Sequence, residues 1–179
     1  MAVAQERYGR ALLEIALSSG KTEEYLDEAE TLLRVIKETP ELISFLKNPK
    51  VTPEEKKDAV KAGFKDFSDD ITGLAEVMID NGRQAEFKDV LEWFVAAAKE
   101  KLGIGVVYVT SAIALSDERK SMIEKKILET SGYKRLEVFY RLDESLIGGV
   151  NIRIRDRIID NSIKTKLGQL TGELRQIQI

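Results

Sequence analysis

The apolar residues of this chain change their spacing once, at Leu102-Gly103-Ile104-Gly105. Before this point they recur every three or four residues, as on one face of a helix, and after it several runs alternate with polar residues, as in a strand. Glycine also ends helices readily. We therefore predict a helical domain at residues 1–102, a linker at 103–105 and a second domain at 106–179. The predicted fold class is α+β, mostly α.

Helix-breaking and capping residues divide the first domain into six segments. Ser19-Gly20, Thr39-Pro40 and Asn48-Pro49 each interrupt a helical pattern, while Thr22 and Thr52 stand where N-caps are expected. The short connections between the segments favour an N-terminal six-helix bundle. The predicted helices span residues 3–19, 22–38, 40–47, 53–63, 69–81 and 84–101.

The first and fifth of these helices carry more apolar surface than packing into a bundle requires. Their apolar positions spread over roughly 240° and roughly 200° of the circumference, whereas an ordinary surface helix needs a little over ~100°. Either these helices are buried centrally, or one edge of each apolar arc is left for a partner. The residues concerned are Ala4, Tyr8, Ala11, Leu12, Leu13, Ile15, Ala16 and Leu17 in the first helix, and Ile71, Leu74, Ala75, Val77, Met78 and Ile79 in the fifth.

The second domain is predicted to be a small α+β domain with a short sheet and a C-terminal helix. Residues 106–114 are rich in β-branched side chains, Ser116 caps a helix at about 117–131, and Arg135–Leu142 alternates cleanly. Gly148-Gly149 then precedes an alternating strand, where a close backbone approach or a bulge explains the glycines. The final helix has apolar residues at the spacing of a packed seam, namely Ile163, Leu167, Leu170, Leu174 and Ile177.

The chain offers little of the chemistry that enzymes use. It contains no cysteine and no histidine, so a thiolate nucleophile and the commonest general base and metal ligand are missing. The Asp143/Glu144 and Asp156/Asp160 pairs have the residue types of a glycosidase acid and base, but their turn and cap contexts already account for them. Gly148-Gly149 lacks the spacing of a phosphate-binding loop. We predict a non-catalytic protein without cofactor or metal.

The length of the apolar runs and the composition of the N-terminus indicate the compartment of the protein. No apolar run approaches the ~20 residues needed to span a bilayer, and the N-terminus lacks the apolar centre of a signal peptide. A soluble, cytosolic protein that does not insert into a membrane is therefore expected.

The charge changes sign between the two domains. Residues 1–104 carry 15 Lys and Arg against 21 Asp and Glu, whereas residues 105–179 carry 13 against 10, which suggests different partners. Arg153, Arg155 and Arg157 occupy alternate positions after Gly148-Gly149 and could face RNA. However, Phe139 is the only aromatic residue identified on the outer face of a neighbouring predicted strand, where bases would stack. We favour protein–protein docking, with a nucleic-acid-binding adaptor using the arginine-bearing strand as the alternative.

Four groups of residues, in order along the chain, match the signature positions of one family. Each group alone is a weak signal, but their order and spacing are specific. The groups are Tyr8-Gly9-Arg10-Ala11-Leu12; Asn81-Gly82-Arg83; Ser111-Ala112 with Leu115-Ser116; and Asp143, Ser145, Leu146, Gly148-Gly149, Ile152, Asp156, Ile159-Asp160 and Ser162. Over essentially its whole length, the chain resembles the family of the F-type ATP synthase delta subunit and the mitochondrial oligomycin-sensitivity-conferring protein.

This resemblance implies a non-catalytic subunit at the top of the peripheral stalk. Such a subunit joins the catalytic head to the membrane-anchored b subunits and resists rotational torque during proton-driven ATP synthesis. The resemblance also implies a peripheral location on the cytoplasmic side of the inner (plasma) membrane, as part of the complex. The second domain is expected to bind the C-terminal helices of the b subunits, with Arg153 and Arg155 as candidate contacts.

The resemblance further implies that the first domain takes the N-terminal helix of an alpha subunit into a groove between its first and fifth helices. These are the two helices whose apolar arcs are too wide, and the recognition mode is a helix in a groove. An aspartate at Val77 or Tyr8 is expected to weaken this binding without unfolding the domain. The candidate groove residues are Tyr8, Ala11, Leu12, Ile15, Leu74, Val77 and Met78.

Overall fold

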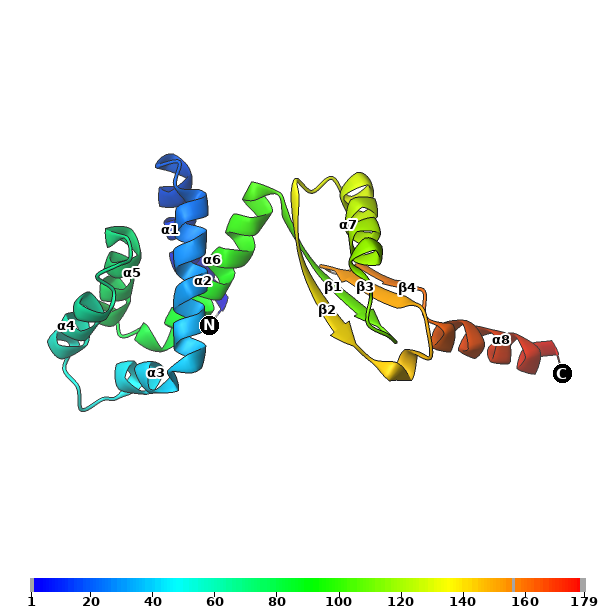
Figure 1. The fold of residues 1–179 in the computed structure, drawn as a ribbon. Helices are drawn as coiled ribbons and strands as arrows, with labels where there is room; N and C mark the ends of the chain where they lie inside the picture. Colours follow the sequence, from blue (N-terminus) through cyan, green and yellow to red (C-terminus); the bar gives the residue numbers. More distant parts are fainter. Residues whose placement is uncertain (1, 156, 178–179) are drawn as a thin grey trace. The chain divides into compact units, whose positions relative to one another are not determined.

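The computed structural model describes residues 2–155 and 157–177, and the side chains of residues 5–155 and 157–170. The chain divides into two compact units, Met1–Leu102 and Gly103–Ile179, which are described separately. Its elements are those of an α+β protein that is mostly helical, as the sequence predicts (Figure 1). The predicted linker at 103–105 is not a separate segment. Gly103 adopts a left-handed φ of +72° after the last helix of the first unit, and strand β1 begins directly at Ile104.

Within its described residues, the N-terminal unit contains six α-helices and one short 3-10 helix. The 3-10 helix η1 (Gln84–Glu86) takes the place of the first turn of the sixth predicted helix. A bundle made of six helices alone is therefore an incomplete description. The α-helices are α1 (Ala2–Ser18), α2 (Thr22–Glu38), α3 (Pro40–Lys47), α4 (Pro53–Gly63), α5 (Asp69–Asp80) and α6 (Phe87–Leu102).

The two threonines predicted as N-caps have different roles. Thr52 forms a capping box at the start of α4: its hydroxyl accepts from the Glu55 N–H at 3.3 Å, and the Glu55 carboxylate accepts from the Thr52 N–H at 2.9 Å. Thr22 is not the N-cap of α2 but its first helical residue. Its side chain is buried, and its hydroxyl donates to the Ala16 carbonyl at 3.2 Å, which ties α2 to the end of α1.

The core of the N-terminal unit is built on α6, which packs against both α1 and α2. Gly9 allows α1 to approach α6 closely, because a Cβ at this position would come within 3.0 Å of the Trp93 ring. Trp93, the single tryptophan of the chain, thus packs between α6 and α1. The buried residues of α6 are Phe87, Val90, Leu91, Phe94 and Ala98.

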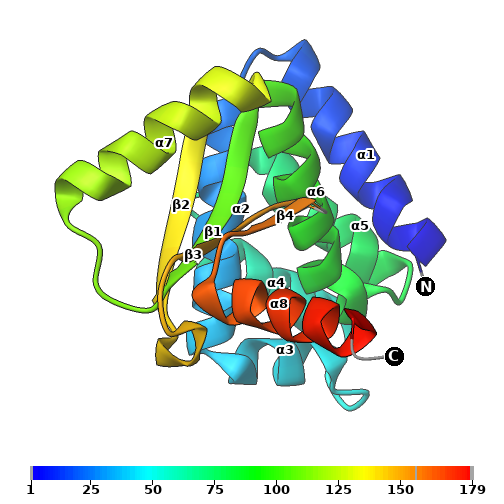
Figure 2. The same cartoon turned by 90° about the vertical axis from the view of Figure 1, so that its right-hand side faces the viewer.

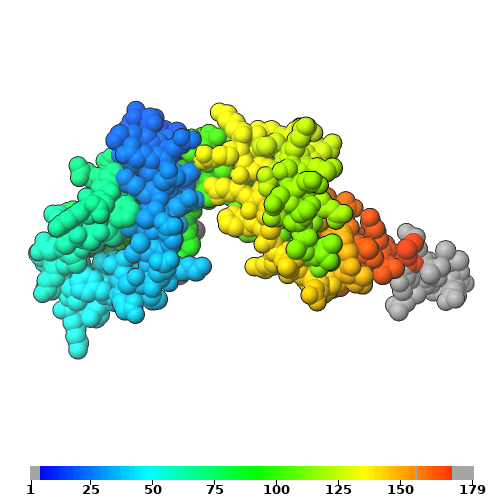
Figure 3. All heavy atoms as spheres, viewed as in Figure 1, coloured from blue at the N-terminus to red at the C-terminus, as the bar shows by residue number. Residues whose placement is uncertain are grey.

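The C-terminal unit is a four-stranded sheet with helix α7 (Asp117–Ser131) on one face (Figure 1). Figure 3 shows the atoms of α7, in yellow-green, at the surface of this unit. The strand order is β2-β1-β3-β4. β1 (Ile104–Ser111) pairs in parallel with β2 (Arg135–Leu142), and α7 supplies the crossover that parallel neighbours require. β3 (Val150–Ile154) pairs antiparallel with β1 and forms a hairpin with β4 (Arg157–Asp160). Val107 and Val109 pack against Ile127 of α7 to form the core.

The Gly148-Gly149 pair lies where two backbone segments meet. Gly149 has a left-handed φ of +80°, and a Cβ there would come within 3.0 Å of the Asn161 carbonyl oxygen. The segment between the 3-10 helix η2 (Glu144–Leu146) and β3 therefore lies directly against the segment that leads into α8 (Ile163–Ile177). The Ile163 N–H donates to the Gly148 carbonyl at 3.0 Å across the same junction. The close backbone approach predicted for this pair is confirmed.

Helix α8 leaves the sheet and does not lie across it (Figure 1, Figure 2). Ile163, Leu167 and Leu170 of its predicted seam are each about half exposed. The seam is therefore only partly buried at these three residues, and Ile163 lies against Gly148 at the start of the helix. Leu174 and Ile177 lie outside the residues whose side chains are described.

Candidate docking groove

An apolar groove of about 440 Å³ lies between α1 and α5. Both helices contribute one edge of their apolar arcs to it, although neighbours in the groove are about 60 residues apart in the sequence. Six of the seven residues predicted for this site line the groove, namely Tyr8, Ala11, Leu12, Ile15, Leu74 and Val77.

Burial divides these residues into a floor and a rim. The side chains of Tyr8 and Leu12 are buried, whereas Ile15 and Val77 are 42% and 48% exposed. Met78, the seventh predicted residue, does not line the groove, since its side chain is fully buried in the core. Met78 lies about 100° around α5 from Val77, which turns its side chain away from the groove rim and into the core.

The wide apolar arcs of α1 and α5 are divided between the core and the solvent. On α1, Leu12 and Ala16 are buried while Ile15 is exposed, and on α5, Ile71 is buried while Val77 is exposed. Neither helix is surrounded by its own unit. Of the two interpretations of these arcs, the structure therefore favours the one in which an edge is left open.

The groove has charged residues on both helices and a gap in its α5 wall. Arg7 of α1 lines the groove, as do Asp69 and Asp70 in the first turn of α5. One turn later, Gly73 lines the groove, and a Cβ there would meet nothing within 4 Å. A partner backbone can therefore come close to α5 at this point. An apolar strip with charges at its border suits an amphipathic helix.

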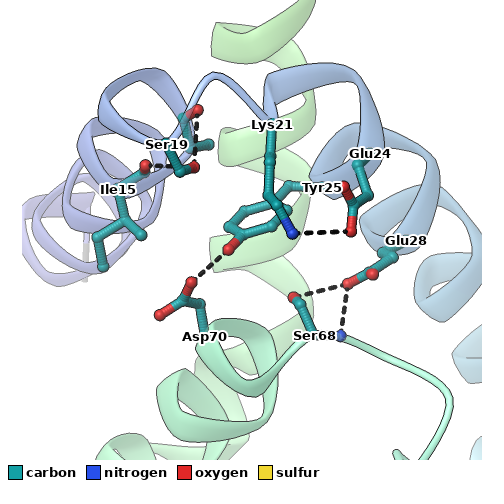
Figure 4. A network of polar contacts seen from close by, with 9 residues as sticks. Ile15, Ser19, Lys21, Glu24, Tyr25, Glu28, Ser68 and Asp70 are labelled. Carbon is teal, nitrogen blue, oxygen red and sulfur yellow. Dashed lines mark hydrogen bonds and ion pairs between the residues drawn. The ribbon is translucent and has the colours of Figure 1, made fainter.

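Side chains of α2 hold the start of α5 in place (Figure 4). The Tyr25 hydroxyl donates to the Asp70 carboxylate, and this hydrogen bond raises the pKa of Tyr25 to about 12. The Glu28 carboxylate accepts from the Ser68 N–H at 2.9 Å and from the Ser68 hydroxyl at 2.7 Å. Ser68 is the N-cap residue of α5, but its own side chain caps no N–H of that helix. Glu28 and Tyr25 therefore anchor one wall of the groove to α2.

Replacing Glu28 by alanine is expected to destabilise the N-terminal unit by about 1 kcal/mol, a typical cost for losing a helix-terminal hydrogen bond. The single tryptophan, Trp93, lies in α6 of this unit, so denaturant unfolding followed by its fluorescence measures the change. Asp27→Ala removes an exposed acid from the preceding position of the same helix and should change stability by less than about 0.5 kcal/mol. Equal effects of the two substitutions would contradict the anchoring role.

One acid of each predicted pair, Asp143 and Asp160, serves as a local cap. Hydrogen bonds from Ser145 hold the pKa of the Asp143 carboxyl below its usual range. Hydrogen bonds from Ser162 and Thr165 do the same for Asp160. A glycosidase acid needs the opposite shift, a raised pKa. Asp156 lies outside the described residues.

The two arginines predicted to dock the b subunits lie beside different aromatic rings. The Arg153 guanidinium is 6.0 Å from the Tyr108 ring centroid, and that of Arg155 is 5.8 Å from the Tyr133 ring centroid. The expectation that Phe139 is the only aromatic residue on the outer face is wrong. Tyr108 of β1 stacks on Phe139 with ring centroids 5.3 Å apart. Its position between the buried Val107 and Val109 is the sequence signal that identifies it as outward-facing.

The fold and the groove define a two-unit protein, in which a helical unit with an apolar groove is joined to a small α+β unit. A family model described as ATP synthase delta (OSCP) subunit matches residues 4–174. The chain belongs to this family. It is a structural, non-catalytic subunit of the peripheral stalk of the ATP synthase. The family and the non-catalytic role predicted from the sequence are thereby confirmed.

Relatives match the chain from end to end. The ATP synthase subunit delta of Lachnoclostridium phytofermentans is 39% identical over 178 residues, covering 99% of this chain and 98% of the relative. The delta subunit of Exiguobacterium sibiricum is 34% identical, with 94% of each chain covered. A chain of the Toxoplasma gondii mitochondrial ATP synthase has the same fold, with a TM-score of 0.77 at 18% identity over 95% of this chain and 96% of that one. None of the helices described for this chain has the length and apolar character needed to cross a membrane.

Proposed function

We propose that the groove between α1 and α5 receives the amphipathic N-terminal helix of an alpha subunit of the catalytic head. The observation that carries this proposal is the pair of exposed apolar residues, Ile15 and Val77, that face one groove from two helices. The apolar face of a partner helix would remove the surface of these two side chains from water. This burial contributes about 25 cal/mol of favourable free energy per Å² of apolar surface, before the costs of association are subtracted.

The C-terminal unit, in this proposal, binds the C-terminal helices of the b subunits. The chain then joins the head to the stalk on the cytoplasmic side of the membrane. In this position it resists the torque that rotation applies to the head. The positive balance of residues 105–179, with 13 Lys and Arg against 10 Asp and Glu, suits an acidic or mixed partner helix. The negative balance of the helical unit suits a different partner.

Titration calorimetry of the full chain with a synthetic peptide of the alpha N-terminal segment from the same organism tests the groove. We expect saturable binding with a Kd on the order of micromolar or tighter and a negative heat-capacity change, because apolar surface is buried. A peptide of the same composition with its apolar stripe scrambled is the control. Equal affinity for the two peptides would show that no apolar face is recognised and would refute the groove proposal.

A further inference from the structure

A row of four residues crosses the sheet of the C-terminal unit on the face opposite to the α7 core. Tyr108 of β1 is paired with Phe139 of β2 on one side and with Arg153 of β3 on the other. Arg153 is in turn paired with Ile158 of β4. Directly paired residues of neighbouring strands point to the same face. We call the row Phe139, Tyr108, Arg153 and Ile158 the open sheet face.

The open sheet face exposes large apolar side chains to solvent. Phe139 is 51% exposed, Tyr108 is 49% exposed and Ile158 is 64% exposed. The two rings stack with an angle of 21° between their planes, and Arg153 lies over the Tyr108 ring. Aromatic residues and arginine are enriched at the centres of protein interfaces, and contiguous exposed apolar patches mark interaction sites.

Two arginines and one aspartate line the surface depression beside this row. The aspartate is Asp143, whose carboxylate accepts from the Ser145 N–H at 3.0 Å. Arg141 lies in the adjacent row, where it is paired with Thr110, and it borders the same surface depression as Arg153. The acid at the end of that row, Asp160, has its carboxylate engaged by Ser162 and Thr165 at the start of α8. Glu137, the acid of β2 on this face, is partly buried. An acidic partner therefore complements the surface better than a basic one.

The length of the row fits a helix. Four adjacent strands span three inter-strand spacings, or about 14 Å, which corresponds to between two and three helical turns of about 5.4 Å. An amphipathic helix lying along the row can place an apolar side chain on Phe139, another about one turn later on Tyr108 and a third about two turns further on at Ile158, with Arg153 between the last two. Single-stranded nucleic acid fits less well, because the two rings already stack on each other and Ile158 offers no stacking surface.

We propose that the open sheet face docks an amphipathic helix whose apolar stripe is bordered by acidic residues. This inference rests on the proposed function, which makes the b subunits the source of that helix. It assigns their contact to Tyr108, Phe139, Ile158 and Arg153, with Arg141 beside them. It therefore keeps Arg153 at the interface but does not include Arg155, whose side chain lies against Tyr133.

Fluorescence anisotropy of a labelled peptide from the C-terminal segment of the b subunit, titrated with the full chain, tests this inference. Ile158→Asp and Arg153→Glu should each weaken binding by about tenfold or more, because interface centres respond strongly to inserted or reversed charge. Arg153→Glu leaves the aromatic pair intact. Added salt should weaken wild-type binding more than binding by this variant. The controls Met122→Asp and Lys125→Glu change exposed residues of α7 in the same chemical way and should stay within about twofold of wild type.

The possible outcomes separate the inference from the proposed function. If the peptide binds and the α7 variants weaken it while the sheet variants do not, the open sheet face is the wrong surface and b-subunit binding stands. If the b peptide does not bind at all while the alpha peptide does, both this inference and the b-subunit part of the proposed function fail. Binding of an oligouridine that Tyr108→Ala abolishes would overturn the inference in favour of a nucleic-acid surface.

Discussion

Replacing Gly149 by alanine should destabilise the C-terminal unit by about 3 kcal/mol or more. Two costs combine at this position. Its φ of +80° is one that side chains rarely adopt, and the new Cβ would press within 3.0 Å of the Asn161 carbonyl oxygen. Backbone on the other side cannot rotate away as a side chain could, so β3 or the start of α8 must shift.

The measurement is denaturant unfolding followed with two signals. Hydrogen exchange of β1 and β3 amides reports on the C-terminal unit, while Trp93 fluorescence reports on the N-terminal unit. We expect the first signal to move to lower denaturant and the second to change little. Gly168→Ala is the matched control, because a Cβ there meets nothing within 4 Å and alanine favours a helix by about 1 kcal/mol over glycine. Equal stability of the two variants would contradict the backbone junction described for Gly149.

Replacing Val77 by aspartate should weaken binding of the alpha-derived peptide by about 30-fold or more, or about 2 kcal/mol. The free protein tolerates the change because Val77 is half exposed on the rim of the groove. In the complex, the carboxylate would be buried against an apolar stripe without a partner charge, which carries a large desolvation cost. Calorimetry gives the affinity, and thermal unfolding checks that the unit still folds.

Val35→Asp is the matched control for this prediction. Val35 is also exposed, lies on α2 and is not among the residues that line the groove. Its substitution should leave the affinity unchanged, and a loss equal to that of Val77→Asp would mean that added negative charge alone weakens binding. Tyr8→Asp, which the sequence also suggested, is a poor probe. Tyr8 is only 8% exposed, so its substitution would damage the core as well as the groove.

Much of this protein could be predicted from its sequence because its local signals agree with one another. The change of apolar period located the junction between the units to within a few residues. The residues predicted as a linker are not a separate segment, because β1 begins at Ile104. Capping signals such as Thr52 and Ser116 placed helix starts correctly, since each side chain accepts from a nearby backbone N–H. The excess width of two apolar arcs pointed to the helices that form the groove.

Features that depend on contacts between distant segments could not be predicted from the sequence. Periodicity alone does not show which residue of an arc lies in the core, so Met78 was placed in the groove although it is fully buried. Thr22 resembled a cap, but its hydroxyl bonds to Ala16 of the preceding helix. The stacking of Tyr108 on Phe139 requires the parallel pairing of β1 with β2, and this register cannot be read from either strand alone.

The most direct test of the account is whether the chain bridges the head and the stalk. Analytical ultracentrifugation of the purified catalytic head with a labelled soluble fragment of the b subunits measures this, with and without the full chain. We predict that the b fragment sediments with the head only when the chain is present. With the Val77→Asp chain, the b fragment should still sediment with the chain, but a smaller share of it should sediment with the head. Equal sedimentation of the b fragment with the head in the absence of the chain would contradict the bridging role.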